Sequence, residues 1–338
     1  MKKTLLRKTG LALASLAMIF GAVSCVKDGS DTCNNILRIV YDYNMDRVDK
    51  FHVQVNFLSI FVFDSQTGLF EEEIKLTGPF NKDFEMFVPQ HLHGKSYDYM
   101  VWAGLNSDSY SFPATLTKGV SKLEDFQVQV KGYEEQLVAQ DLEPLWHGLI
   151  RNVKFEINDE KTEVISLMKD TKTFRVVFSF TEGTEQESEL VFPYDIEDLE
   201  LSIYSADGWY DYTNTLLDPV NRDIRYATYL AQTDDNGGYI FELNTLRLMA
   251  DRNATLVVRV KSEDTEVFRM PLNNYLNLLR LTEESWVSDF QEYLDREDNF
   301  RILIFINNNE VGENGWLSFK IMINDWTVRE HNIGGNNP

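Results

Sequence analysis

Cys25 is the residue whose type and position could most directly do chemistry. It follows the small residues Ala22 and Ser24 at the end of an apolar run, residues 10–23, and that run is preceded by four cations, Lys2, Lys3, Arg7 and Lys8. A basic start, an apolar run of this length and small residues at its end are typical of a secretory leader. A thiol at the cleavage point can be acylated. We therefore predict lipidation of Cys25, with residues 1–24 as a bacterial lipoprotein signal peptide. The alternative is an ordinary secretory leader with an incidental cysteine.

Cys33 is the second of only two cysteines. If Cys25 is acylated, a single thiol is left, which excludes a disulfide framework and a cysteine-based metal site. A Cys25–Cys33 disulfide is the competing interpretation. The polar residues around Cys33 predict that residues 25–35 form a tether between the lipid and the fold.

Other residue types that carry chemistry form no recognisable catalytic constellation. The sequence has no GxSxG, GxGxxG, HExxH or phosphate-loop motif. His91 and His93 are the one pair of histidines with a spacing that could bring two imidazoles together, but they lie in a predicted turn without a nearby cysteine, which favours surface histidines. Carboxylates are so numerous that the sequence cannot single out a hydrolytic pair. We expect no enzyme, metal site or cofactor.

Two acidic loops and one aromatic cluster could bind ligands. Residues 64–68 and 234–237 each begin with aspartate and could suggest calcium, but neither matches the twelve-residue calcium loop, so hairpin turns are the favoured interpretation. Trp209, Tyr210 and Tyr212 surround Asp211 and could hold a sugar ring. More often such a cluster packs at the edge of a β-sandwich.

The charge of the chain excludes one class of partner. The formal net charge of the 338 residues is −22, and four cations lie in the leader, so the mature chain would carry −26. So acidic a protein repels nucleic acid and anionic lipid, and no basic patch offsets this. Attachment to a membrane must therefore come from the acyl chains on Cys25.

Short strand patterns separated by turn residues dominate the mature chain. The patterns occupy residues 36–43, 53–63, 84–88, 97–102, 126–130, 174–180, 199–203, 239–243, 256–260, 302–306 and 317–323. They predict an all-β protein with two tandem β-sandwich domains, at residues 36–148 and 149–338. The run over 53–63 is apolar on both faces, which indicates a strand buried on both sides. Residues 283–295 have helical spacing and predict one short helical insertion.

Several segments in order resemble the FimB-like family of fimbrial anchor lipoproteins from Bacteroidetes. They are Val40–Met45 with Asp49 and Phe51, Phe61–Asp64 with Gly68, Val101–Gly104, Leu145–Gly148, Gln291–Asp298, and Asn314–Trp316 followed by Ile321–Trp326. Val23 in the leader and Trp146, where the family more often has phenylalanine, are departures. We expect Trp316 and Trp326 to be core or edge aromatics, and Asp295 and Arg296 to form a local polar clamp.

The resemblance implies two transthyretin-like β-sandwiches and a non-enzymatic role. That role is to hold or assemble a surface fimbria at the cell outer membrane through strand addition with a stalk subunit. Cleavage at Arg38 or Arg47 would separate the fold from its lipid, so we predict that the strand at 36–43 stays in place. The alternative function is a surface lipoprotein that binds glycans for a carbohydrate-uptake system, and a surface hydrolase has the least support.

Overall fold

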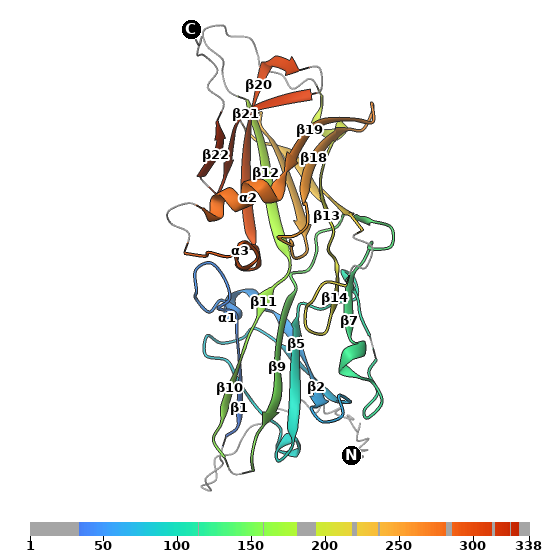
Figure 1. Ribbon diagram of the computed structural model, residues 1–338, viewed down its shortest axis with the longest axis vertical. Coiled ribbons are helices and arrows are strands. Elements are labelled where there is room, and N and C mark those ends of the chain that lie inside the picture. Colours follow the sequence, from blue (N-terminus) through green and yellow to red (C-terminus); the bar gives the residue numbers. More distant parts are fainter. Residues whose placement is uncertain are drawn as a thin grey trace, which may run out of the picture.

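The computed structural model describes residues 34–330 except 114, 158, 181–193, 218–221, 236, 282–285, 313–314 and 325. For residues 180, 306–312, 315–319 and 326–330 it describes the backbone alone. The described strands form five sheets in two β-sandwich-like halves stacked along the long axis of the molecule (Figure 1). The protein is mostly β with few helices, as the strand patterns predict.

The N-terminal half contains three layers. Sheet 1 has the order β10 (Thr162–Ser166), β1 (Ile36–Val40), β4 (Glu85–Phe87). Sheet 2 has the order β11 (Met168–Lys169), β9 (Trp146–Lys154), β5 (Ser96–Ala103), β2 (Phe57–Asp64), β3 (Phe70–Thr77). Sheet 3 has the order β14 (Trp209–Asp211), β7 (Gln127–Val130), β6 (Tyr110–Ser111).

Sheet 2 is buried on both faces. Leu58, Ile60 and Val62 of β2 pack in one core with β1. Phe61 and Phe63 point the other way and belong to a second core that includes β7. Because successive side chains of a strand alternate between faces, this confirms the prediction of a strand buried on both sides. The strand begins at Phe57, however, because residues 51–54 form α1 (Phe51–Gln54).

The C-terminal half packs two larger sheets face to face. Sheet 4 has the order β19 (Thr265–Pro271), β18 (Thr255–Val260), β13 (Leu199–Ser205), β15 (Ile224–Ala227), β8 (Leu137–Val138). Sheet 5 has the order β16 (Leu230–Thr233), β17 (Tyr239–Thr245), β12 (Lys172–Phe180), β20 (Asn299–Gly312), β21 (Gly315–Ile323), β22 (Trp326–Glu330). Their facing side chains share one core, including Leu201 and Val258 of sheet 4 and Val176 and Leu243 of sheet 5.

Strands also pass between the two halves. β14 pairs with β7, and β8 pairs in parallel with β15, so each half contributes a strand to a sheet that the other half builds. The predicted boundary at residues 148 and 149 falls inside β9, and β10 and β11 still pair with N-terminal strands. The division into 36–148 and 149–338 stays a prediction, and the strand pairing favours a point near residues 170–172.

The described helices differ from the single predicted insertion at 283–295. α3 (Phe290–Arg296) lies within that range, but its N-cap is Asp289, whose carboxylate accepts the Glu292 amide hydrogen. Residues 282–285 lie outside the described residues. α2 (Leu272–Arg280) was not predicted, and it buries Leu272, Leu276 and Leu279. Those leucines recur at helical spacing, but they follow β19 directly. The change from the two-residue period of a strand to the period of a helix therefore has no turn residues to mark it.

Candidate functional site: the N-terminal strand and the junction between the halves

β1, the first described strand, is the central strand of sheet 1. It pairs in parallel with β10 and antiparallel with β4. Leu37 and Ile39 are buried in the core between sheets 1 and 2, and so is Tyr41, one residue beyond the strand. Burial of each such side chain stabilises the fold by roughly 1.5–3 kcal/mol. Removing β1 would therefore expose an apolar groove and two strand edges.

The two arginines that could be cleavage points differ in their surroundings. Arg38 lies inside β1, with Glu85 opposite on one side and Val164 on the other. A protease binds its substrate as an extended, unpaired strand, and Arg38 offers no such segment. Arg47 is exposed in a turn with a φ of 54°, and its guanidinium carbon lies 3.2 Å from the centre of the Trp286 ring.

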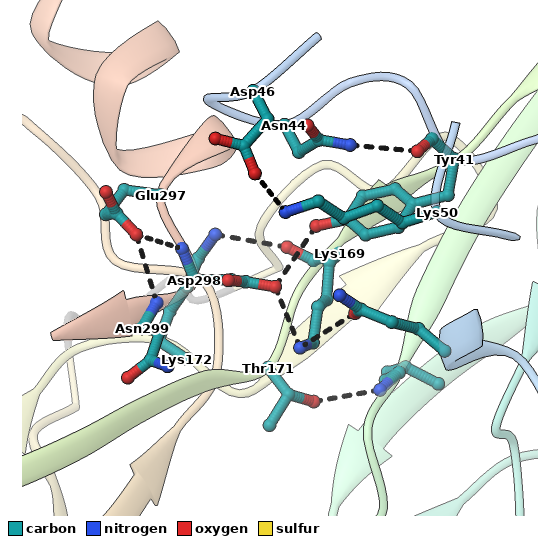
Figure 2. Close-up of polar contacts among 12 residues, drawn as sticks. Tyr41, Asn44, Asp46, Lys50, Lys169, Thr171, Lys172, Glu297, Asp298 and Asn299 are labelled. Carbon is teal, nitrogen blue, oxygen red and sulfur yellow. Dashed lines mark hydrogen bonds and ion pairs between the residues drawn. The ribbon is translucent and has the colours of Figure 1, made fainter. Parts of the chain in front are cut away.

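A polar cluster joins the end of β1 to the C-terminal half (Figure 2). The Tyr41 hydroxyl donates to Asp298 Oδ2 at 3.1 Å, and Lys169 Nζ lies 2.8 Å from the same oxygen. Burial and the neighbouring Asp298 raise the pKa of Tyr41, so its hydroxyl remains a donor. Burial alone would raise the pKa of Asp298, but Lys169, Lys172 and the Tyr41 hydroxyl together outweigh it, and the pKa lies below its usual value. Tyr41, Asp298 and Lys169 fix the strand after the tether to the base of β20.

A second ion pair closes the same junction within the C-terminal half. Arg247 Nε lies 2.6 Å from Asp295 Oδ1, and its Nη2 lies 2.8 Å from Asp295 Oδ2. Gln291, one turn earlier in α3, donates to Asp295 Oδ1 at 2.8 Å. The Asp295 side chain is only 7% exposed. Arg296 does not join Asp295 in the predicted clamp: it pairs with Glu292 and stacks over Tyr43 at 3.8 Å.

Lys172 and Asp170 are buried where the chain passes from sheet 2 to sheet 5. Lys172 Nζ donates to the carbonyl oxygens of Asp295 at 2.9 Å and Lys169 at 3.1 Å. Asp170 Oδ1 accepts the Asn214 amide at 2.7 Å. Burial lowers the pKa of Lys172 and raises that of Asp170, in each case against the pull of neighbouring opposite charges. Sequence reasoning missed this pair, since nothing local marks a lysine or aspartate as buried.

The structure explains why glycine occupies one position in each of two family motifs, Val101–Gly104 and Leu145–Gly148. Gly104 has a φ of +73°, and a Cβ atom there would lie 1.7 Å from the Pro144 carbonyl oxygen. At Gly148 a Cβ atom would lie 2.7 Å from Ile165 and 2.8 Å from Leu167. Close contact with the Pro144 backbone therefore requires glycine at position 104, and close packing of the Ile165 and Leu167 side chains favours it at position 148.

The histidines are held as separate side chains. His91 is exposed and its Nε2 lies 2.8 Å from Glu72 Oε1, whereas His93 Nε2 lies 3.2 Å from the Val88 carbonyl oxygen. Among the described residues no group of three or more His, Cys, Asp or Glu could hold a metal ion. His147 is buried, with Nε2 3.0 Å from the Tyr212 carbonyl oxygen, and burial lowers its pKa to about 4.

The aromatic cluster is divided between two faces. Tyr210 is fully buried. Trp209 is half-buried, donates to Gln127 Oε1 at 3.1 Å and meets Tyr133 edge to face. Asp211 Oδ1 accepts the amide hydrogens of the turn that follows, including that of Thr213 at 2.8 Å. These contacts fit the packing of a sandwich edge. Trp209 is the accessible ring of β14.

The two acidic loops are hairpin turns. Residues 64–68 connect β2 to β3. Asp234, Asp235 and Gly237 lie between the antiparallel partners β16 and β17, and residue 236 is outside the described residues. Asp234 Oδ1 accepts the Gly238 amide at 2.7 Å.

Several predicted features lie outside the described residues. They are Cys25, Cys33, the leader, nearly all of the tether, and the side chains of Trp316 and Trp326. In the described part of the chain no helix is both long and apolar enough to cross a membrane.

Comparison with known proteins gives a family and a fold. The family model for fimbrillin-A associated anchor proteins Mfa1 and Mfa2 matches residues 30–332. No curated protein matches the sequence. A candidate polysaccharide-binding protein from Bacteroides thetaiotaomicron is 31% identical, with a TM-score of 0.74 over 89% of this chain and 99% of that chain. A candidate adhesin from the same species is 27% identical, with a TM-score of 0.71 over 88% and 98%.

The fimbrial anchor protein Mfa2 from Porphyromonas gingivalis has the same fold. It is 15% identical, with a TM-score of 0.63 over 88% of this chain and 99% of that chain. The family model spans most of the sequence, including β1 and the junction. The chain therefore belongs to the family of fimbrillin-A associated anchor proteins Mfa1 and Mfa2.

Proposed function

We propose that this protein fastens a surface fimbria to the outer membrane, with its lipid on Cys25 and a stalk subunit bound by strand addition. Membership of a family of fimbrial anchor proteins makes it a structural protein, not an enzyme, with a place at the cell surface. The observation that supports the role of a membrane-tethered anchor is the position of β1, a buried central strand that directly follows the predicted tether. Pull on the fimbria would then pass from the sandwiches through β1 to the membrane.

A retained β1 means that the subunit joins the polymer at one end only. Displacing it costs the burial of Leu37, Ile39 and Tyr41 and the contact of Tyr41 with Asp298. An incoming strand would have to replace all of these. We propose that the stalk subunit adds to another sheet edge, where backbone groups are available without that cost.

The lipid anchor is tested by comparing Cys25→Ala with Cys33→Ala, which removes the other thiol. An affinity tag inserted between Gly119 and Val120 lies in an exposed loop. We expect the wild type and Cys33→Ala to yield an acylated peptide starting at Cys25 and a co-purified stalk subunit from detergent-solubilised outer membranes. Cys25→Ala should leave the membrane fraction. Acylation without any fimbrial subunit would contradict the anchor role.

The retention of β1 is tested with a disulfide between β1 and β10. Arg38 and Val164 are register partners on the outward face of sheet 1, so Arg38→Cys with Val164→Cys, in a Cys33→Ser background, should lock β1 in place. We expect the oxidised protein to bind stalk subunit as well as either single variant does. Loss of binding that returns on reduction would show that β1 must leave.

Glycan binding is the second candidate, favoured by the description of the 31% identical relative as a candidate polysaccharide-binding protein. Within β14, Trp209 is the ring that could take part, since Tyr210 is buried. Retarded migration in polysaccharide-containing native gels that is lost in Trp209→Ala would support this function.

A further inference from the structure

The outward face of sheet 1 is apolar at the end from which the tether leaves. Leu37 of β1 points into the core, so Ile36 and Arg38 point outward. Ile36 lies opposite Phe87 of β4, and Arg38 lies opposite Val164 of β10. Phe87 is 54% exposed and Val164 is 49% exposed. Two large apolar side chains thus flank the first strand, on the side away from the core.

The loop between β9 and β10 lies at the same end of the molecule, on the core side of Asn35. Ile157 in that loop is 60% exposed. The preceding residue, Glu156, accepts the Asn35 side-chain amide at 2.8 Å, so the loop lies against the residue that leads into β1. The amide of Val88, next to Phe87, donates to the Asn35 carbonyl oxygen at 2.9 Å. Ile36, Phe87 and Val164 of the outward face, together with Ile157 at the same end of the molecule, form the tether-end patch.

The tether keeps this patch close to the membrane. Asn35 lies ten residues after Cys25, and even a fully extended chain of ten steps spans only about 36 Å. Sheet 1 begins at the end of the molecule that is opposite the C-terminal half (Figure 1). A patch beside Asn35 is therefore held within reach of any bilayer that holds the acyl chains.

We propose that the tether-end patch rests on the lipid surface of the outer membrane and sets the direction in which the protein stands. This rests on the proposed lipidation of Cys25. A patch of only a few apolar side chains binds a bilayer weakly by itself. A lipid tether makes the contact intramolecular and holds the patch at a high effective concentration near the bilayer. Arg38, between Ile36 and Val164, can cover apolar surface with its stem while its charge stays among the headgroups.

The cations around the patch lie beside acids, and Arg38 itself lies opposite the exposed Glu85 of β4. Lys154 pairs with Glu156 at 2.6 Å, and Lys161 pairs with Glu163 at 2.8 Å. Cations beside the patch are thus matched by acids, unlike those of proteins that bind anionic lipid. The contact therefore depends on apolar burial, and anionic lipid should not strengthen it.

The test uses the acylated full-length protein reconstituted in phosphatidylcholine vesicles. In a Cys33→Ser background, acylation leaves an introduced cysteine as the only free thiol. Phe87→Cys and Ile157→Cys each carry an NBD fluorophore, and Leu278→Cys is the matched control, because Leu278 is 48% exposed on α2 in the other half. Circular dichroism checks that each variant folds. Emission wavelength and quenching by lipids with a nitroxide near the headgroup report contact with the bilayer.

We expect NBD at positions 87 and 157 to shift to the blue and to be quenched, the control to remain water-like, and added phosphatidylglycerol to change neither result. Water-like emission at all three positions from vesicle-bound, acylated protein would overturn the proposal while leaving the anchor intact. Burial of position 87 only after stalk subunit is added would also overturn it, in favour of a protein interface. Protein without acyl chains would instead refute the proposed lipidation.

Discussion

Replacing Asp295 with asparagine should destabilise the protein far more than removing the charge of a similar pair at the surface. Arg247 and Asp295 make two contacts of 2.6 and 2.8 Å, and their side chains are 15% and 7% exposed. Asp295→Asn removes one charge and leaves the Arg247 guanidinium buried without its counter-ion. Breaking such a pair costs about 3–5 kcal/mol.

The matched control is the exposed pair of Arg269 and Glu266. Its two contacts are both 2.6 Å, but its side chains are 57% and 31% exposed. Exposed pairs contribute about 0–1 kcal/mol, so Glu266→Gln should change stability little. For a domain of 150–250 residues, 1 kcal/mol shifts the Tm by about 2–4 °C, so we expect Asp295→Asn to lower it by about 6–20 °C.

Thermal unfolding of the soluble Cys25→Ala protein, followed by calorimetry, measures both variants. A Tm for Asp295→Asn within a few degrees of that for Glu266→Gln would refute the argument that burial, and not geometry, decides the cost. Arg247→Met with Asp295→Leu removes both charges and should recover part of the loss.

The remaining predictions concern pH, a glycine and β1. His147 has a pKa of about 4 in the fold against 6.5 when exposed. The free energy of unfolding should therefore be highest above pH 6.5 and fall by about 3 kcal/mol between pH 6.5 and 4, because the unfolded chain binds the proton first. Urea unfolding of His147→Gln should lack this dependence on pH. Gly104→Ala should prevent folding, as judged by circular dichroism, whereas Gly119→Ala, with the same sign of φ and open space, should cost about 1–2 kcal/mol. Leu37→Ala should cost about 2–5 kcal/mol in urea unfolding, and Val53→Ala, at 70% exposed, almost nothing.

Local pattern was sufficient for most of the β-structure. Runs such as residues 97–102 and 239–243 are short, rich in aromatic and aliphatic residues and bounded by turn residues, and each is a strand in the fold. The run at 53–63 also carried the signal of burial on both faces, because both alternating sets are apolar. The periodicity of the sequence did not reveal α1 or α2. The four residues of α1 are too few to define a helical repeat, and the nine residues of α2 follow β19 directly, without a turn between them.

The family followed from short motifs, some of which record backbone constraints. Gly104 and Gly148 are glycine because a neighbouring segment leaves no room for a Cβ atom. In the motif Gln291–Asp298, Asp295 pairs with Arg247, and Gln291, one turn earlier, donates to Asp295. The sequence could present these residues as a pattern, but their partners come from distant parts of the chain.

The sequence by itself therefore determined the all-β class, the family and the predicted lipid on Cys25, because each depends on neighbouring residues or on ordered local motifs. Tertiary structure alone decided that β7 and β14 pair across the halves, that Lys172 and Asp170 are buried, and that Phe87 lies opposite Ile36. Strand pairing and burial depend on which distant segments meet, and side-chain periodicity records only which face of a strand is covered.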